Sequence, residues 1–154
     1  MTSISQPLTA TSLTRKKMSN EDTVEQFQRL KISTPNFGHK EHVEIAYEML
    51  CKYEFVDACA RYARTIRAIA VQHGAAEKYN ATITFAFMSV IAERKSLMEG
   101  GDLEQFLADN PDLLDKNVLM NWYSEERLTS AKARAQFLLP DRASAEAGCL
   151  APRT

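Results

Sequence analysis

Two of the chain's three histidines, His39 and His42, lie three residues apart in the segment NFGHKEHVEIAYEML, residues 36–50. The segment has the apolar spacing of an amphipathic helix, and side chains three apart share a helix face, so both imidazoles can reach one ligand. Both belong to the first helical turn, where the positive end of the helix dipole disfavours imidazolium. A neutral imidazole suits a metal ligand or a general base. The pair is therefore our candidate catalytic and metal site, with either ring as the base. The alternative is that both rings meet only solvent or a neighbouring loop.

Two imidazoles alone do not complete a metal centre. Catalytic zinc uses three protein ligands, and the non-haem iron triad uses two histidines and a carboxylate. Further ligands would have to come from Glu93, Tyr79 or Asn80, although the pattern favours a solvated position near a helix end for Glu93. The cofactor that this pair favours is a divalent metal ion, and the sequence leaves open whether one is bound.

A polar pocket is expected where two predicted helices begin, one near His39 and one near Glu77. Besides the two histidines, we expect Tyr79, Asn80 and Thr82 to line it. Such a pocket would bind a small molecule or a metal ion and would support acid-base or metal-assisted chemistry.

A basic ridge is a further candidate contact for a small-molecule ligand. Arg61, Arg64 and Arg67 follow one another at intervals of three residues, which places them along one side of a helix. Arg64 is the member that we assign to cofactor binding. The alternative is a solvated face, since Asp57 offers Arg61 a local partner four residues away.

Composition and motifs exclude several other functions. The chain has 19 basic and 20 acidic residues, so it lacks the positive footprint that nucleic-acid binding requires. No apolar run approaches the roughly 20 residues of a membrane span. Three cysteines without CxxC spacing suit a reducing compartment, so we expect a cytoplasmic protein. No glycine-rich phosphate loop, GxSxG elbow or HExxH motif is present.

The elements that must position these residues are helices. Apolar residues recur with helical period over residues 39–53, 55–73 and 77–99, and shorter pieces begin at Asp102, Asn110, Ser124 and Ser130. No segment shows the alternation of a strand. The sequence predicts an all-α, single-domain compact bundle, with two or three long helices closed by several short ones.

Domain organisation follows from where this periodicity starts and stops. Residues 1–18 are rich in serine and threonine and predict a disordered leader, residues 19–141 form the helical domain, and residues 142–154 predict a disordered tail. Within the domain, we expect Ile66 and Ile69 to be buried between helices.

Four segments resemble an uncharacterised family of small all-helical proteins: FGHKEHVEIAYEML, GAAEKYNATITFAF, NPDLLD and WYSEERLTSAKARAQFLLPD. The resemblance spans residues 37–141. It implies a site with histidines at positions 39 and 42 and commonly a third in a KYHxT segment, where this chain has Asn80. The amide would then replace an imidazole, or metal binding would be weakened. No activity follows from the resemblance.

The runner-up function is a noncatalytic helical module that binds another protein through an exposed apolar face. Trp122, Tyr123 and Phe137 are its candidate anchors, and a homo-oligomer is possible. Substituting the two histidines distinguishes the two hypotheses, because side chains of a first helical turn lie at the rim of the core and can be removed at little cost to the fold. Replacing both His39 and His42 with alanine should therefore cost less than about 1.5 kcal/mol of stability while abolishing ligand binding.

Removing residues 1–18 and 143–154 together should leave the melting temperature nearly unchanged, since neither segment has the periodicity needed to pack. Calorimetry on the full and shortened chains measures this. A fall of more than about 4 °C would show that one of the ends contributes to the folded core.

Overall fold

The computed structural model describes residues 20–31 and 37–142, in which helices are joined by turns and loops. No strand occurs in these ranges, which confirms the all-α, single-domain prediction. The predicted leader and nearly all of the predicted tail lie outside the described residues. No helix in the described ranges is both long and apolar enough to cross a membrane.

Three long helices, α2, α3 and α4, form the body of the fold. The α-helices are α1 (Asn20–Gln28), α2 (His39–Lys52), α3 (Phe55–Gln72), α4 (Ala81–Ser96), α5 (Leu103–Asp109), α6 (Glu125–Thr129) and α7 (Ala131–Ala135). Short 3-10 helices are η2 (Ala76–Lys78), η3 (Pro111–Leu114) and η4 (Val118–Asn121). The bounds of α2 and α3 agree with the prediction to within one residue.

Local contacts explain where α2 begins and where α3 begins and ends. The Glu41 carboxylate accepts a hydrogen bond from the Gly38 N–H at 2.9 Å, at the start of α2. The Glu54 side chain accepts from the Asp57 N–H at 3.0 Å and caps α3. After α3, Gly74 takes a φ of +65°, a left-handed conformation that glycine adopts without strain.

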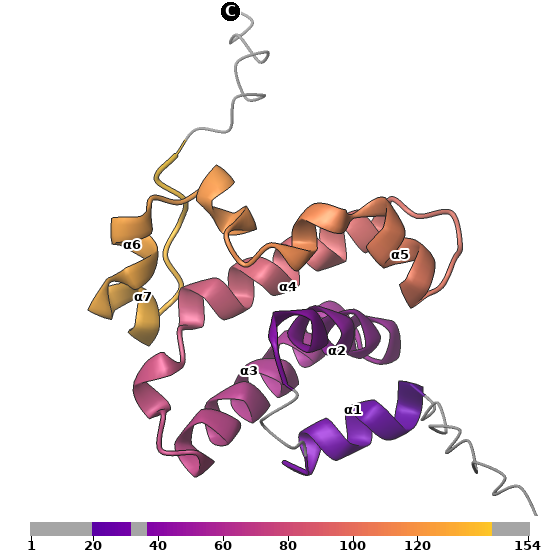
Figure 1. The fold of residues 1–154 in the computed structure, drawn as a ribbon, viewed down its shortest axis with the longest axis horizontal. Coiled ribbons are helices and arrows are strands. Elements are labelled where there is room, and N and C mark those ends of the chain that lie inside the picture. Colours follow the sequence, from indigo (N-terminus) through magenta and orange to yellow (C-terminus); the bar gives the residue numbers. More distant parts are fainter. Residues whose placement is uncertain (1–19, 32–36, 143–154) are drawn as a thin grey trace, which may run out of the picture.

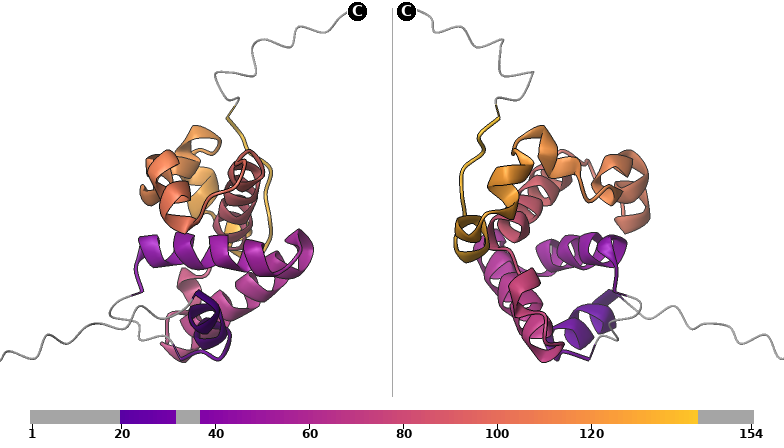
Figure 2. Two further views of the ribbon diagram at one scale, coloured as in Figure 1. Left: turned by 90° about the vertical axis from the view of Figure 1, so that its right-hand side faces the viewer. Right: turned by 60° about the vertical axis from the view of Figure 1, so that its left-hand side comes forward.

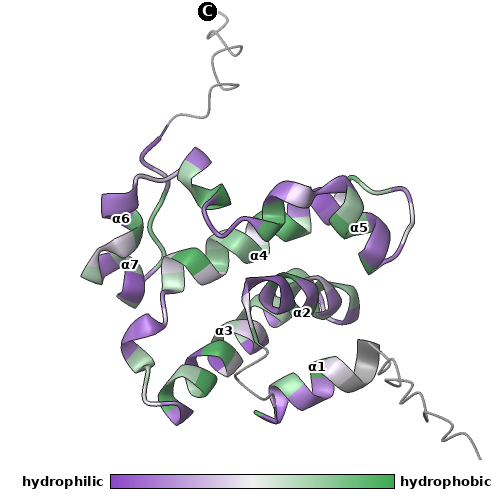
Figure 3. Cartoon of the chain, in the orientation of Figure 1, coloured by the Kyte–Doolittle hydropathy of each residue, from purple (hydrophilic) through white to green (hydrophobic). Residues whose placement is uncertain are grey.

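The helices form two layers with α4 between them (Figure 1). On one side of α4 lie α1, α2 and α3, and on the other lie η4, α6 and α7. Helix α5 lies at the C-terminal end of α4, where α5 and η3 also pack on α2. In further views α4 again lies beside both groups (Figure 2), and it packs on α2, α3, η4 and α7. The central position of α4 explains why it is apolar along most of its length (Figure 3).

Two clusters of buried side chains meet at α4. The larger one joins α1, α2, α3, α4 and α5, and its fully buried members include Phe27, Val43, Met49, Met88, Ile91 and Phe106. The smaller one joins α4 to the C-terminal third and contains Ala86, Val118, Leu119, Tyr123 and Leu128. Because α4 supplies both clusters, the two layers share one folding unit.

The core predictions for α3 are right for one isoleucine and wrong for the other. Ile69 is buried, with 8% of its surface exposed. Ile66 is only half-buried, because its side chain borders a cavity between α2, α3 and α4. Helical spacing predicted the correct helix face for both residues but not how deeply each side chain is buried.

The start of α4 differs from the prediction, which placed it near Glu77. Asn80 is the N-cap: its Oδ1 accepts from the Ile83 N–H at 3.0 Å, so the α-helix starts at Ala81. The preceding residues form η2 instead. The Asn80 Nδ2 also donates to the Leu128 carbonyl at 2.6 Å, which ties α4 to α6.

Thr82 makes a second buried link between α4 and the C-terminal third. Its Oγ1 donates to the Gln136 carbonyl at 2.7 Å and accepts from the Leu138 N–H at 3.1 Å, and the residue is fully buried. The extended segment after α7 is held by these two bonds. Thr82 therefore stabilises the packing of this segment on α4.

The change Thr82→Val should cost about 1 to 3 kcal/mol, because it keeps the side-chain shape but leaves the buried Leu138 N–H without a partner. Thr65→Val is the matched control, since the Thr65 hydroxyl donates only to the Arg61 carbonyl within α3. Urea denaturation gives both values. Equal costs for the two changes would contradict the proposed link between α4 and the segment after α7.

Candidate functional site

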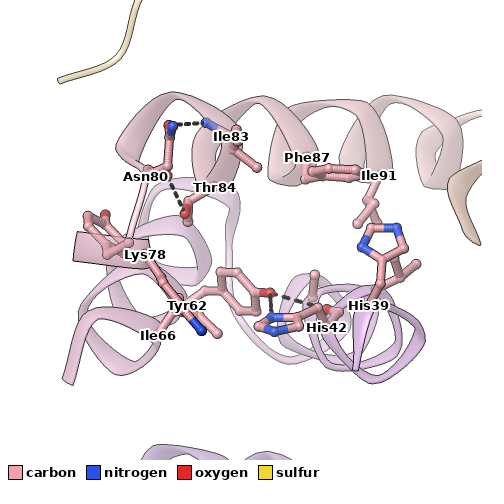
Figure 4. Close-up of a pocket in the computed structure, with 13 residues that line it drawn as sticks. His39, His42, Tyr62, Ile66, Lys78, Asn80, Ile83, Thr84, Phe87 and Ile91 are labelled. Atoms are coloured by element: carbon pink, nitrogen blue, oxygen red, sulfur yellow. Dashed lines mark hydrogen bonds between the residues drawn. The ribbon is translucent and has the colours of Figure 1, made fainter. Parts of the chain in front are cut away.

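A cavity of about 230 Å³ lies between α2, α3 and α4, and both histidines border it (Figure 4). Its apolar wall comes from all three helices and consists of Val43, Ala46, Ile66, Ile83, Phe87 and Ile91. Its polar lining consists of His39, His42, Tyr62, Lys78, Tyr79, Asn80 and Thr84. The spacing of His39 and His42 thus brings both rings to one cavity.

His39 joins the start of α2 to the chain beyond α5. Its Nε2 lies 2.8 Å from the Leu113 carbonyl oxygen, and a carbonyl only accepts, so Nε2 carries the proton. In the neutral ring this leaves Nδ1 as an acceptor. The ring also meets Phe87 edge-on, with centroids 5.2 Å apart.

His42 is paired with Tyr62, which reaches it from α3. The His42 Nδ1 lies 3.1 Å from the Tyr62 hydroxyl, and that hydroxyl lies 3.3 Å from the His42 carbonyl oxygen. If Tyr62 donates to Nδ1, the proton of the neutral ring is on Nε2. If Tyr62 donates to the carbonyl, Nδ1 donates to Tyr62 and Nε2 becomes an acceptor. Tyr62 therefore allows His42 to offer either a donor or an acceptor at Nε2.

Burial keeps the His42 ring neutral. Desolvation is the main cause that lowers its pKa from 6.5 to about 4; the nearby charge of His39 lowers it further, and Glu41 raises it slightly. Phe37 adds to the cover, with its ring centroid 4.3 Å from that of His42. The sequence expected a neutral ring because of the helix dipole, whereas here burial is the leading cause. Burial also raises the pKa of Tyr62, so its hydroxyl keeps its proton.

One nitrogen on each ring is still open. His39 Nδ1 and His42 Nε2 have no hydrogen-bond partner in the described residues. No fully buried side-chain nitrogen or oxygen in those ranges lacks a partner, so neither ring nitrogen is sealed from solvent-sized molecules. A bound molecule can therefore form a hydrogen bond with each of these nitrogens.

The histidines have structural contacts as well. His39 is fixed by Leu113 and Phe87, and His42 by Tyr62 and Phe37. Because two packed rings and their hydrogen bonds are lost together, we expect the double alanine change to cost more than the sequence-based limit of about 1.5 kcal/mol.

Only some of the other predicted site residues reach the cavity. Tyr79 and Asn80 line it, but the Asn80 amide already bonds to Ile83 and Leu128, so its first role is structural. Thr82 does not line it, since its hydroxyl is hydrogen-bonded to the segment after α7. Arg64 is exposed on α3 and does not line it either.

Sequence reasoning did not assign Tyr62, Phe87 and Lys78 to the site. Tyr62 falls on the apolar face of α3, and the spacing of apolar residues gives no sign that its hydroxyl meets His42. Lys78 follows a predicted helix start that the structure replaces with η2. Its place at the cavity depends on that turn.

Among the described residues, no carboxylate, thiol or third imidazole joins His39 and His42 to form a metal centre. The described ranges contain no group of three or more histidine, cysteine, aspartate or glutamate side chains arranged to hold a metal ion. Glu93 is exposed and borders a separate groove together with Trp122 and Phe137. His39 and His42 therefore present two imidazoles without a carboxylate or thiol to complete a set.

The three aromatic residues considered as anchors for a protein partner have different environments. Tyr123 is buried, and its hydroxyl donates to the Leu138 carbonyl at 2.9 Å, so it belongs to the core. Trp122 is half-buried, and Phe137 has 46% of its surface exposed. Only Trp122 and Phe137 offer surface to a partner.

Comparisons with protein-family models, curated proteins and solved structures found no match to this chain.

Acidification should destabilise the protein through His42. The His42 ring takes up a proton near pH 6.5 in the unfolded chain and near pH 4 in the folded chain. The contribution of its burial to stability is therefore fully present above pH 6.5 and is lost as the pH falls toward 4. The loss between pH 7.5 and 4.5 should be about 2 to 3 kcal/mol larger in the parent than in His42→Gln. Urea titrations at both pH values measure it, and equal losses would contradict a buried neutral ring.

Proposed function

We propose that this protein binds a small, largely apolar molecule in the cavity between α2, α3 and α4. The observation that carries the proposal is that His39 and His42 border one apolar cavity and each has a ring nitrogen free for a hydrogen bond. A binding site of this kind combines apolar walls with a few fixed polar groups.

The size of the cavity limits the ligand. Pockets for drug-sized molecules measure about 300 to 1,000 Å³. A cavity of about 230 Å³ is smaller. An apolar cavity of about 150 Å³ holds benzene, so a cavity of about 230 Å³ suits a ligand on the order of ten non-hydrogen atoms.

The chemistry of His42 favours binding over catalysis. A general base works best when its pKa is near the working pH, and a pKa of about 4 makes His42 a weak base at neutral pH. A neutral imidazole is, however, a good hydrogen-bond partner inside an apolar cavity. Tyr62 holds the ring in place for this purpose.

Filling the cavity tests the proposal. Ala46 is buried and lines the cavity, so Ala46→Leu would occupy part of the space that a ligand needs. We expect compounds of about ten non-hydrogen atoms that bind the parent, detected by NMR shifts, to bind Ala46→Leu at least about tenfold more weakly. Ala108→Leu, on the exposed surface of α5, is the control and should bind like the parent.

Thermal unfolding of each variant confirms that it is folded. The proposal fails if no compound in such a screen binds the parent, or if the compounds that do bind are unaffected by Ala46→Leu.

A further inference from the structure

Lys78 differs from every other residue that lines the cavity. It alone among the lining residues carries a permanent charge at neutral pH, and it alone is exposed. Its side chain forms no ion pair or hydrogen bond within the part of the chain that the structure describes. It extends from η2, near Tyr62 and Ile66, whereas His39 and Ile91 lie at the other end of the cavity (Figure 4). The ammonium group therefore marks the open end.

A second positive charge lies close to the same end. The Arg67 guanidinium on α3 opposes the effect of burial on the pKa of the Tyr79 phenol, which places it near that lining residue. No aspartate or glutamate is among the described residues that line the cavity. Two nearby carboxylates, Glu77 in η2 and Glu41, which acts on the pKa of His42 away from Lys78 (Figure 4), do not line the cavity. The charge at the entrance is therefore positive.

The interior of the cavity, in contrast, disfavours any charge, since it is apolar and keeps His42 uncharged. A charged group in such a place costs several kcal/mol unless it is paired, whereas a charge at the rim keeps part of its hydration and gains a nearby partner. Beside apolar walls, the attraction between Lys78 and an anion is also stronger than in bulk water. A ligand that fits both regions has one negative charge at one end and an apolar body, and an uncharged polar group on that body would meet the free ring nitrogens of His39 and His42.

We propose that the ligand is a small monocarboxylate with an apolar aliphatic or aromatic body, whose carboxylate pairs with Lys78 at the entrance while the body lies between Ile66, Ile83 and Phe87. This inference rests on the proposed binding function and names its ligand class. Lys78 acts as the specificity residue, because it separates acids from neutral molecules of the same shape.

Two isosteric pairs of probes test the assignment: hexanoate with hexanamide, and phenylacetate with phenylacetamide. Each pair differs mainly in charge. Titration at neutral pH, followed by NMR, should show at least one acid bound about tenfold more tightly than its amide. Lys78→Gln should reduce this preference to about threefold or less, while binding of the amide changes little.

Lys116→Gln is the matched control, since Lys116 is an exposed lysine that does not line the cavity. It should keep the full preference for the acid. Ala46→Leu should weaken binding of the acid, which shows that the body of the probe enters the cavity.

The results separate the two proposals. If amides bind as tightly as acids, or if Lys78→Gln keeps the preference, the carboxylate assignment is wrong while small-molecule binding stands. If acids bind but Ala46→Leu has no effect, they bind elsewhere and the assignment is also wrong. If neither acid binds the parent, the assignment is overturned, and the separate screen with compounds of other classes decides whether the cavity binds a small molecule.

Discussion

The fold depends on the polar contacts at the start of α4. Asn80 caps the helix and donates to Leu128, and Thr82 bonds to the backbone at Gln136 and Leu138. These groups are buried, and a buried polar group without a partner is costly, so the contacts fix one arrangement of α4 against the C-terminal third. The opposite side of α4 is then free to pack on α2 and α3.

The cavity is a consequence of this arrangement. Because Asn80 delays the start of α4, the preceding residues turn through η2 and place Lys78 and Tyr79 at one end of the space between the helices. Ala46 on α2 leaves room opposite α4. The same polar contacts that hold the two layers together therefore also shape the site, and the site combines a positive entrance with a neutral, apolar interior.

Helical periodicity predicted much of this fold, including the bounds of α2 and α3 and the shared cavity of His39 and His42. It failed where the outcome depends on distant partners. Thr82 was assigned to the pocket, but its hydroxyl partners lie more than 50 residues away, at Gln136 and Leu138. The depth of Ile66 and the pairing of Tyr62 with His42 also depend on how helices pack, which spacing along one helix does not encode.

Nitrogen-15 NMR of the His42 ring tests the central claim most directly, because it reports both the protonation state and the contacts of the two ring nitrogens. The account predicts a neutral ring at pH 7, with titration well below the ordinary value of 6.5. It also predicts that a bound compound of about ten non-hydrogen atoms shifts the His42 Nε2 resonance. A ring that titrates near 6.5 and does not respond to any bound compound would contradict the account.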